Sequence, residues 1–202
     1  MRTPIRLAAS LAALATLVLV PLAAAPATAE EMAAPAGFRA DWLANFDSTV
    51  DHVRQLADAI PADKYGWRPA EGVRSIGEAV GHLAVANYYL SSFLGAEMPE
   101  GMTMESEKES DPAKLHAMLD ASVAHVHSVI EGMSDADLEK EVEFFGNKMS
   151  SRGLLFVALG HVHEHLGQLI AYGRSNGVVP PWSMPAPAEE KAVAEGEAES
   201  KY

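Results

Sequence analysis

Three histidines occupy alternate positions in GHVHEHLGQLIAYGR, residues 160–174. The segment has helical periodicity, and a helix advances about 100° per residue, so residues four apart share a face while residues two apart lie nearly opposite. His161 and His165 are therefore predicted to point together, and His163 to point away from them. Two imidazoles one turn apart can bring their ring nitrogens about 3 Å apart, the spacing that two ligands of one metal ion need.

Many helices carry two histidines at this spacing without binding a metal, so a third ligand from another helix would decide between the two cases. His82 is the best candidate, because it lies in the middle of a predicted helix beside small residues such as Gly81 that leave room for an ion. His52, in the first predicted helix, is the competing third or fourth ligand. For each histidine the alternative is a polar position on the flank of an amphipathic helix.

Three further residues follow the candidate ligands at whole-turn spacing. Gln168 lies one turn after His165, where its side chain could orient the ligand ring or contact a substrate. Tyr89 and Tyr172 lie two turns after His82 and His165 and could line the mouth of a pocket. Aromatic residues at these spacings are also common in a helical core, and this reading stays open for both tyrosines.

Three neutral imidazoles would leave a fourth coordination position open, as in catalytic rather than structural zinc sites. Such a site could acidify a water molecule or polarise a substrate oxygen or sulfur. Zinc, nickel and iron all accept these ligands, so the sequence predicts a divalent metal ion without fixing its identity. No general base is evident, because Glu164 points about 60° or more away from the ligand histidines and helix capping explains Glu78.

Four segments with helical periodicity must position these residues, and three of the four show it as an apolar seam of spacing 3 and 4. The second begins at a capping box, Ser75 with Glu78, and the third at a cap followed by proline, Asp111-Pro112. The expected helices run from about Trp42 to Ile60, Ile76 to Leu94, Pro112 to Met133, and Ser151 to Ser175.

Residues 134–150 break the helical pattern before the last helix. Glu141 to Phe144 alternate as in a short strand, Gly146-Asn147 suits a turn, and Ser134 could cap a helical turn. The predicted fold is therefore all-α, an antiparallel four-helix bundle with a longer irregular crossover between helices 3 and 4.

The ends of the chain are predicted to lie outside this bundle. Residues 1–29 have the arginines, apolar run and small-residue site of a signal peptide, and the run is shorter than the roughly 20 residues that span a bilayer. Residues 30–36 are a linker, 37–184 the bundle domain, and 185–202 an acidic tail that is expected to be disordered. We therefore expect export to the periplasm or the cell exterior, without stable membrane insertion after cleavage.

Charge and cysteine content exclude two classes of function. The chain has 15 Lys and Arg against 28 Asp and Glu, and removing residues 1–29 takes away two arginines and no acid, which moves the formal charge from -13 to -15. Nucleic acid is therefore not expected as a partner, because phosphate binding needs a basic surface. The chain has no cysteine, which excludes disulfides and thiolate catalysis by the protein itself.

Two segments carry a resemblance to a known family. RSIGEAVGHLA, with the preceding WRPAEGVRS, and GHVHEHLGQLIAYGRSNGVVPPWS resemble the DinB-like (DinB/YfiT) superfamily of four-helix-bundle metalloproteins over roughly residues 38–183. The resemblance implies that His82, His161 and His165 bind one divalent ion. Known members include thiol-dependent transferases and a maleylpyruvate isomerase, but low-molecular-weight thiols are chiefly intracellular, which disfavours that chemistry for an exported chain.

Two functions follow from these observations. The first is an exported metal-dependent transferase or hydrolase that acts on a small molecule. The second is a non-catalytic metal- or ligand-binding bundle of the cell envelope, with a filled coordination shell to which His52 would contribute. The substrate is unspecified in both, and a homodimer is allowed.

Overall fold

Helix starts follow the capping signals in the sequence. The computed structural model describes residues 35–184, so the predicted leader, most of the linker and the acidic tail lie outside the described residues. Helix α2 (Ile76–Ser92) begins at Ser75, whose hydroxyl accepts from the Glu78 amide at 3.2 Å while the Glu78 carboxylate accepts from the Ser75 amide at 2.7 Å. Helix α3 (Pro112–Gly132) begins after Asp111, whose carboxylate accepts from the Ala113 amide at 2.9 Å.

The other two long helices end as the sequence indicates, although the first of them begins four residues before the predicted Trp42. Helix α1 (Phe38–Ala59) ends before Pro61, which cannot continue the helical hydrogen bonds. Helix α5 (Ser151–Ser175) is capped by the Ser150 hydroxyl and is followed by Gly177 in the left-handed conformation, with φ of 78°. The four predicted helices and the all-α fold class are confirmed.

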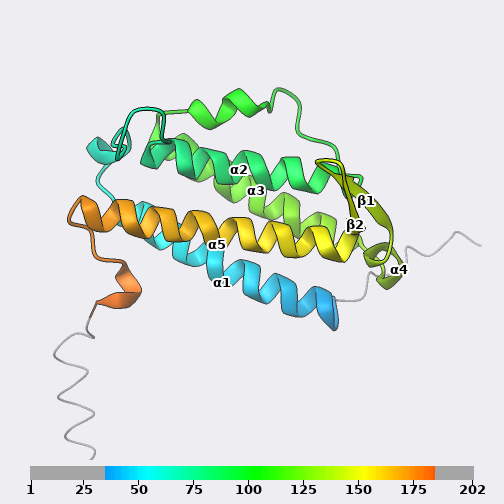
Figure 1. Cartoon of the computed structure of the whole chain (residues 1–202). Coiled ribbons are helices and arrows are strands. Elements are labelled where there is room, and N and C mark those ends of the chain that lie inside the picture. The colour runs from blue at the N-terminus through cyan, green and yellow to red at the C-terminus, as the bar shows by residue number, and fades with distance from the viewer. Residues whose placement is uncertain (1–34, 185–202) are drawn as a thin grey trace, which may run out of the picture. The chain divides into compact units, whose positions relative to one another are not determined.

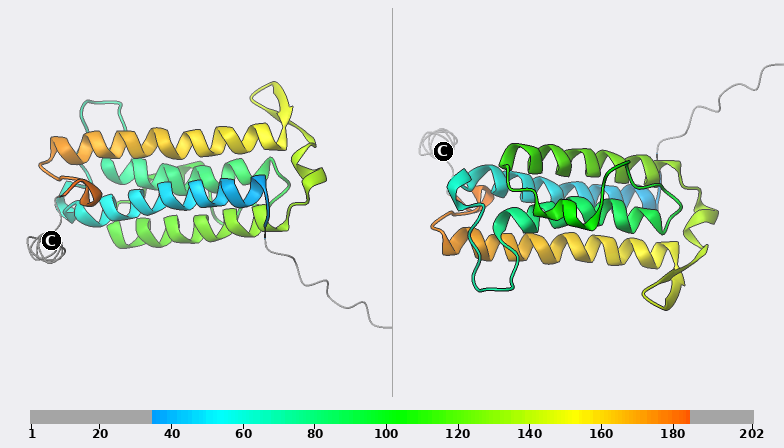
Figure 2. Two further views of the ribbon diagram at one scale, coloured as in Figure 1. Left: turned by 90° about the horizontal axis from the view of Figure 1, so that it is seen from below. Right: turned by 90° about the horizontal axis from the view of Figure 1, so that it is seen from above.

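The four long helices lie side by side as a bundle, with α1 and α5 running in one direction and α2 and α3 in the other (Figures 1 and 2). Near the starts of α1 and α5, the Trp42 indole donates to the Leu155 carbonyl at 2.9 Å. Near the starts of α2 and α3, a Cβ on Gly77 would lie 3.3 Å from the Leu115 side chain. The parallel α2–α3 pair corrects the prediction that the bundle is antiparallel throughout, because it requires a further long connection, between α2 and α3, that returns the chain along the bundle.

That connection is residues 93–111, which contain the short 3-10 helix η2 (Met104–Lys108) and lie along α2 (Figures 1 and 2). Its contact with α2 depends on Gly81, because a Cβ there would lie 2.6 Å from the Glu107 carbonyl oxygen. Gly81 was expected to leave room for an ion beside His82. Instead it lets the backbone of η2 approach α2 closely, which brings the Glu107 side chain to the bundle.

The irregular region between α3 and α5 contains the predicted helical turn and strand, and differs from the prediction in the position of its tight turn. Helix α4 (Asp135–Leu138) precedes an antiparallel hairpin of β1 (Glu141–Phe144) and β2 (Asn147–Ser150). The turn consists of Phe145 and Gly146, with φ of 48° and 77°, so it begins one residue earlier than predicted. Two positive φ values are typical of the tight turns that match the twist of a hairpin.

The core runs the length of the bundle and draws on all four long helices. Its fully buried large side chains include Phe46, Leu56, Leu83, Leu115 and Leu169. The bundle also contains the two remaining 3-10 helices at one end, η1 (Ala62–Lys64) and η3 (Pro181–Ser183). Within residues 35–184, none of the helices has the length and hydrophobicity needed to span a bilayer.

Candidate metal centre

Three histidines from α2 and α5 meet between the middles of these helices. The Nε2 atom of His161 lies 3.1 Å from Nε2 of His82 and 3.1 Å from Nε2 of His165. One nitrogen from each ring lies within 4.8 Å of the other two, so the group could hold one metal ion. Nitrogens bound about 2.0–2.1 Å from a tetrahedral zinc ion lie about 3.3 Å from one another, close to the observed spacing.

The far nitrogen of His82 is held by a carboxylate from η2. Its Nδ1 lies 2.7 Å from Oε2 of Glu107, and Arg74 donates from Nη2 to the same oxygen at 3.3 Å. An ionised carboxylate only accepts hydrogen bonds, so Nδ1 of His82 carries the hydrogen. The neutral His82 ring therefore presents the lone pair of Nε2 to the other two histidines.

The far nitrogen of His165 is held by its own helix. Its Nδ1 lies 2.7 Å from Oε1 of Gln168, and the Gln168 amide nitrogen donates to the Tyr172 hydroxyl at 2.9 Å. The Gln168 oxygen is thereby directed at His165, whose Nδ1 must donate the hydrogen. His165 also presents an Nε2 lone pair to the centre, and the expected contact of Gln168 with a ligand histidine is observed.

This arrangement leaves lone pairs facing one another unless a cation lies between them. His161 can give an Nε2 hydrogen to His82 or to His165 but not to both, so at least one converging lone pair has no donor. The Nδ1 atom of His161 is buried and has no hydrogen-bond partner among the described residues. Buried polar atoms without partners are costly and unusual, and a metal ion would satisfy the three Nε2 atoms together.

The surroundings of the two α5 histidines, His161 and His165, keep these two rings neutral. Burial lowers the pKa of His161 to about 4, and repulsion from His165, His82 and Arg74 acts in the same direction. Burial also lowers the pKa of His165, against the opposing hydrogen bond to Gln168. Metal binding requires the neutral imidazole, which is the form that these pKa values favour at neutral pH.

The packing of α5 separates its histidines as predicted. His161 and His165 face α2, whereas His163 lies on the flank that faces α1, where its Nε2 is 3.2 Å from the Thr49 hydroxyl. His52 also belongs to α1, and its ring packs against Trp182 with centroids 4.3 Å apart. In the part of the chain that the structure describes, His52 does not join the histidine group, because α1 lies on the other side of α5.

Of the two candidate tyrosines, one is connected to the histidine centre and the other is not. Tyr172 reaches the centre through Gln168, and its ring packs edge-on against Trp67 with centroids 5.3 Å apart. Tyr89 packs edge-on against Phe93 at 5.1 Å, toward the end of α2. Among the described residues Tyr89 therefore has a packing contact with Phe93 and no hydrogen bond to a histidine of the centre.

The sequence reasoning missed Glu107 and Arg74. Both lie outside the four helical seams: Arg74 directly precedes the Ser75 cap, and Glu107 is one of several acidic residues in a polar connection. The signal that could have identified the connection is Gly81, a glycine in the interior of a helix, which often marks the close approach of another backbone. Nothing in the sequence distinguishes Glu107 from Glu105 or Glu109.

Comparison with known proteins identifies the family of this chain. Residues 45–169, more than half of the chain, match the DinB superfamily. The chain belongs to the DinB superfamily. The uncharacterized protein YjoA of Bacillus subtilis is 24% identical over 138 residues, which cover 67% of this chain and 88% of YjoA.

Solved structures of the superfamily share the fold. A DinB-like protein of Bacillus cereus has a TM-score of 0.61 at 20% identity, covering 69% of this chain and 93% of its own. The YjoA structure has a TM-score of 0.57 at 24% identity, covering 72% and 95%. YfiT of Bacillus subtilis, described as a probable metal-dependent hydrolase with an unusual four-helix bundle topology, has a TM-score of 0.55 at 14% identity, covering 69% and 88%.

Proposed function

We propose that this protein binds one divalent metal ion through His82, His161 and His165 and hydrolyses a small molecule at that ion. The observation that carries the proposal is the set of hydrogen bonds behind the rings. Glu107 holds Nδ1 of His82 at 2.7 Å and Gln168 holds Nδ1 of His165 at 2.7 Å, so both Nε2 lone pairs converge on His161. Partners of this kind fix the tautomer and orientation of metal ligands.

The residues of the chain have separate roles in this proposal. The three histidines hold the ion, Glu107 and Gln168 orient two of the rings, and Tyr172 fixes the Gln168 amide. When bound, a divalent ion supplies Lewis-acid chemistry that acidifies water or polarises a substrate oxygen. Zinc, nickel and iron all suit three imidazoles, so the metal is left to measurement.

Hydrolysis is preferred over the alternatives for two reasons. YfiT, which shares the fold, is described as a probable metal-dependent hydrolase. The non-catalytic alternative needs a filled shell, and the residue expected to fill it, His52, packs against Trp182 instead. A group-transfer reaction would use the same open coordination position of the metal ion, and an activity screen can detect it as a second outcome.

Export is part of the proposal and is supported by residues 1–29 alone. We expect expression of the full chain in a bacterium with the Sec pathway to yield periplasmic or secreted protein that begins near Glu30. Cell fractionation and N-terminal sequencing measure this. An uncleaved chain that stays in the cytoplasm would contradict export and would reopen thiol-dependent transfer.

The metal site is tested by analysis of protein purified without a histidine tag. We expect about one equivalent of metal per chain after reconstitution, and its loss in His82→Ala and His161→Ala. His163→Ala is the matched control, because His163 lies on the same helix and faces α1. Unchanged stoichiometry in the first two variants would refute the site.

Catalysis is tested on the loaded protein. A panel of ester, amide and phosphate-ester substrates should show hydrolysis that is lost on chelation and returns with the metal, and that is absent in His161→Ala. A metal-loaded protein whose cobalt spectrum does not change with any added ligand would have a closed shell, which would favour the non-catalytic function.

A further inference from the structure

Arg74 lies beside the histidine group but outside it. Its Nη2 donates to Oε2 of Glu107 at 3.3 Å, and the same oxygen lies 2.7 Å from Nδ1 of His82. One carboxylate oxygen therefore separates the guanidinium from a proposed metal ligand. Arg74 reaches this position because it directly precedes the cap of α2, while η2 supplies Glu107 from the other side.

The hydrogen-bonding capacity of Arg74 is largely unused. Its Nε is buried and has no partner, and the 3.3 Å bond to Glu107 is its one hydrogen bond among the described residues. Arg68, on the same loop, makes two hydrogen bonds, donating to the Val73 carbonyl and to Glu78 at 3.1 Å each. The two side chains are equally accessible, at 39% for Arg74 and 41% for Arg68. At nearly equal accessibility, Arg74 therefore has more unused donors than Arg68, and of the two only Arg74 has an Nε that is buried without a partner among the described residues.

Charge makes this position distinctive in an acidic protein. The chain has a formal charge of -13, so most of its surface repels anions. Three neutral imidazoles with a divalent ion carry +2, and Glu107 and Arg74 cancel each other. Glu164, whose charge also acts on His165, leaves a net charge of +1. The centre is thus a local positive region, with a guanidinium fork whose planar donors match a carboxylate or phosphate.

The loop that carries Arg74 also reaches the hydrogen bonds behind His165, through Trp67. Trp67 packs against Tyr172, whose hydroxyl accepts from Gln168 behind His165. Backbone hydrogen bonds from Ile76 to Trp67 and from Gly77 to Tyr65, at 3.0 and 2.8 Å, fix this loop to the start of α2. Arg74 and Trp67 are therefore held on a loop whose two ends are attached to the helix that carries His82.

We infer that Arg74 binds an oxyanion of the substrate, a carboxylate or a phosphate, and so restricts the enzyme to small anionic molecules. This inference rests on the proposed function, since it assigns the substrate class of the same centre. Glu107 holds the guanidinium in place from one side, and the unused donors bind the anion. Arg74 is then a substrate-binding residue, whereas Glu107 is a positioning residue.

The test measures binding of inorganic phosphate by titration calorimetry to zinc-loaded protein, with zinc saturation verified for each variant. Charge-assisted hydrogen bonds of this kind change affinity by about 10-fold or more. We expect Arg74→Gln to weaken phosphate binding by at least that factor, and Arg74→Lys to recover part of it through charge. Arg68→Gln is the matched control and should bind phosphate like the wild type.

The outcomes separate this inference from the proposed function. Equal phosphate affinity in wild type and Arg74→Gln, both fully loaded with zinc, would overturn the inference and leave the metal site standing. A chain that binds none of zinc, nickel and iron would refute the proposed function, and the same phosphate titration of the metal-free proteins would still test Arg74. Reduced zinc affinity in Arg74→Gln with unchanged phosphate affinity would assign Arg74 to positioning Glu107, which also overturns the inference.

Discussion

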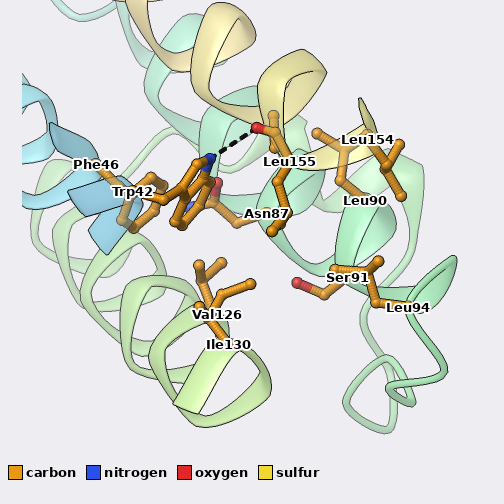
Figure 3. Close-up of a pocket in the computed structure, with 11 residues that line it drawn as sticks. Trp42, Phe46, Asn87, Leu90, Ser91, Leu94, Val126, Ile130, Leu154 and Leu155 are labelled. Carbon is orange, nitrogen blue, oxygen red and sulfur yellow. Dashed lines mark hydrogen bonds between the residues drawn. The ribbon is translucent and has the colours of Figure 1, made fainter. Parts of the chain in front are cut away.

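Two interior regions of the bundle both contain buried polar atoms, and they differ in how those atoms are satisfied. The first is the histidine centre between α2 and α5. The second is a cavity of about 20 Å³ whose lining includes Trp42, Phe46 and Asn87 (Figure 3). In the cavity region the Trp42 indole donates to the Leu155 carbonyl and the Asn87 amide donates to the Ser122 hydroxyl, at 2.9 Å each.

The difference distinguishes packing from function. The cavity has about the volume that one water molecule needs, and its wall is mostly apolar, so it is a gap in the packing and not a substrate site. In the histidine centre at least one of the converging Nε2 lone pairs has no donor, and Nδ1 of His161 is buried without a partner among the described residues. A protein retains unsatisfied polar groups of this kind where a ligand completes them.

The largest effect on stability is expected from a substitution in the cavity region. Phe46 is 1% exposed and stacks on Trp42 with centroids 5.0 Å apart. Phe46→Ala should lower the free energy of unfolding by about 3–5 kcal/mol, because it enlarges a cavity that the bundle cannot fill. Urea denaturation measures the loss. Metal content per folded chain should stay at the wild-type value, and its loss in a folded variant would show that the two regions are coupled.

The second effect is stabilisation by bound metal, which the histidine centre should provide and the packed core should not. A metal that binds only the native state stabilises it by about 2.7 kcal/mol when free metal exceeds its dissociation constant 100-fold. We therefore expect chelation to lower the melting temperature of the wild type, and to leave that of His161→Ala unchanged. A wild type indifferent to chelation would indicate a bundle held by packing alone.

The third effect is on metal affinity through Glu107. Loss of a carboxylate behind a ligand histidine weakens metal binding by about 10–100-fold. We expect this range for Glu107→Gln, measured by competition with a chromophoric chelator, with little change in the stability of the metal-free protein. Glu105→Gln is the control, since Glu105 lies on η2 and pairs with Lys108 at the surface.

Gly81→Ala tests the same contact through the backbone. The new Cβ would lie 2.6 Å from the Glu107 carbonyl, so η2 must move away from α2. Metal affinity should fall as in Glu107→Gln although every polar group is retained. Wild-type metal affinity in both Gly81→Ala and Glu107→Gln would show that Glu107 has no role in the centre.

The sequence predicted the elements better than their order in space. Capping residues and apolar seams are local, so α1, α2, α3 and α5 could be read from the chain, and i, i+4 spacing separated His161 and His165 from His163. The parallel direction of α2 and α3 depends on the path of residues 93–111, which have no apolar seam. For the same reason Glu107 could not be identified and His52 remained a candidate, since both depend on which helices are neighbours.

The smallest effect is a pH dependence that only the centre should show. In the metal-free protein, burial lowers the pKa of His161 to about 4 and also lowers that of His165. An unfolded histidine has a pKa near 6.5, so below that pH the unfolded chain binds more protons than the folded chain, and stability falls as pH decreases. The contribution of His161 to stability is lost between about pH 6.5 and pH 4.

Urea denaturation with a chelator measures this from about pH 7 to about pH 5. The free energy of unfolding should decrease less in His161→Gln than in the wild type, whereas Phe46→Ala should lower it equally at each pH. If the unfolding free energy changed equally with pH in the wild type and in His161→Gln, His161 would not be held in its neutral form. The histidine centre would then not differ from the cavity region at the residue on which the comparison chiefly depends.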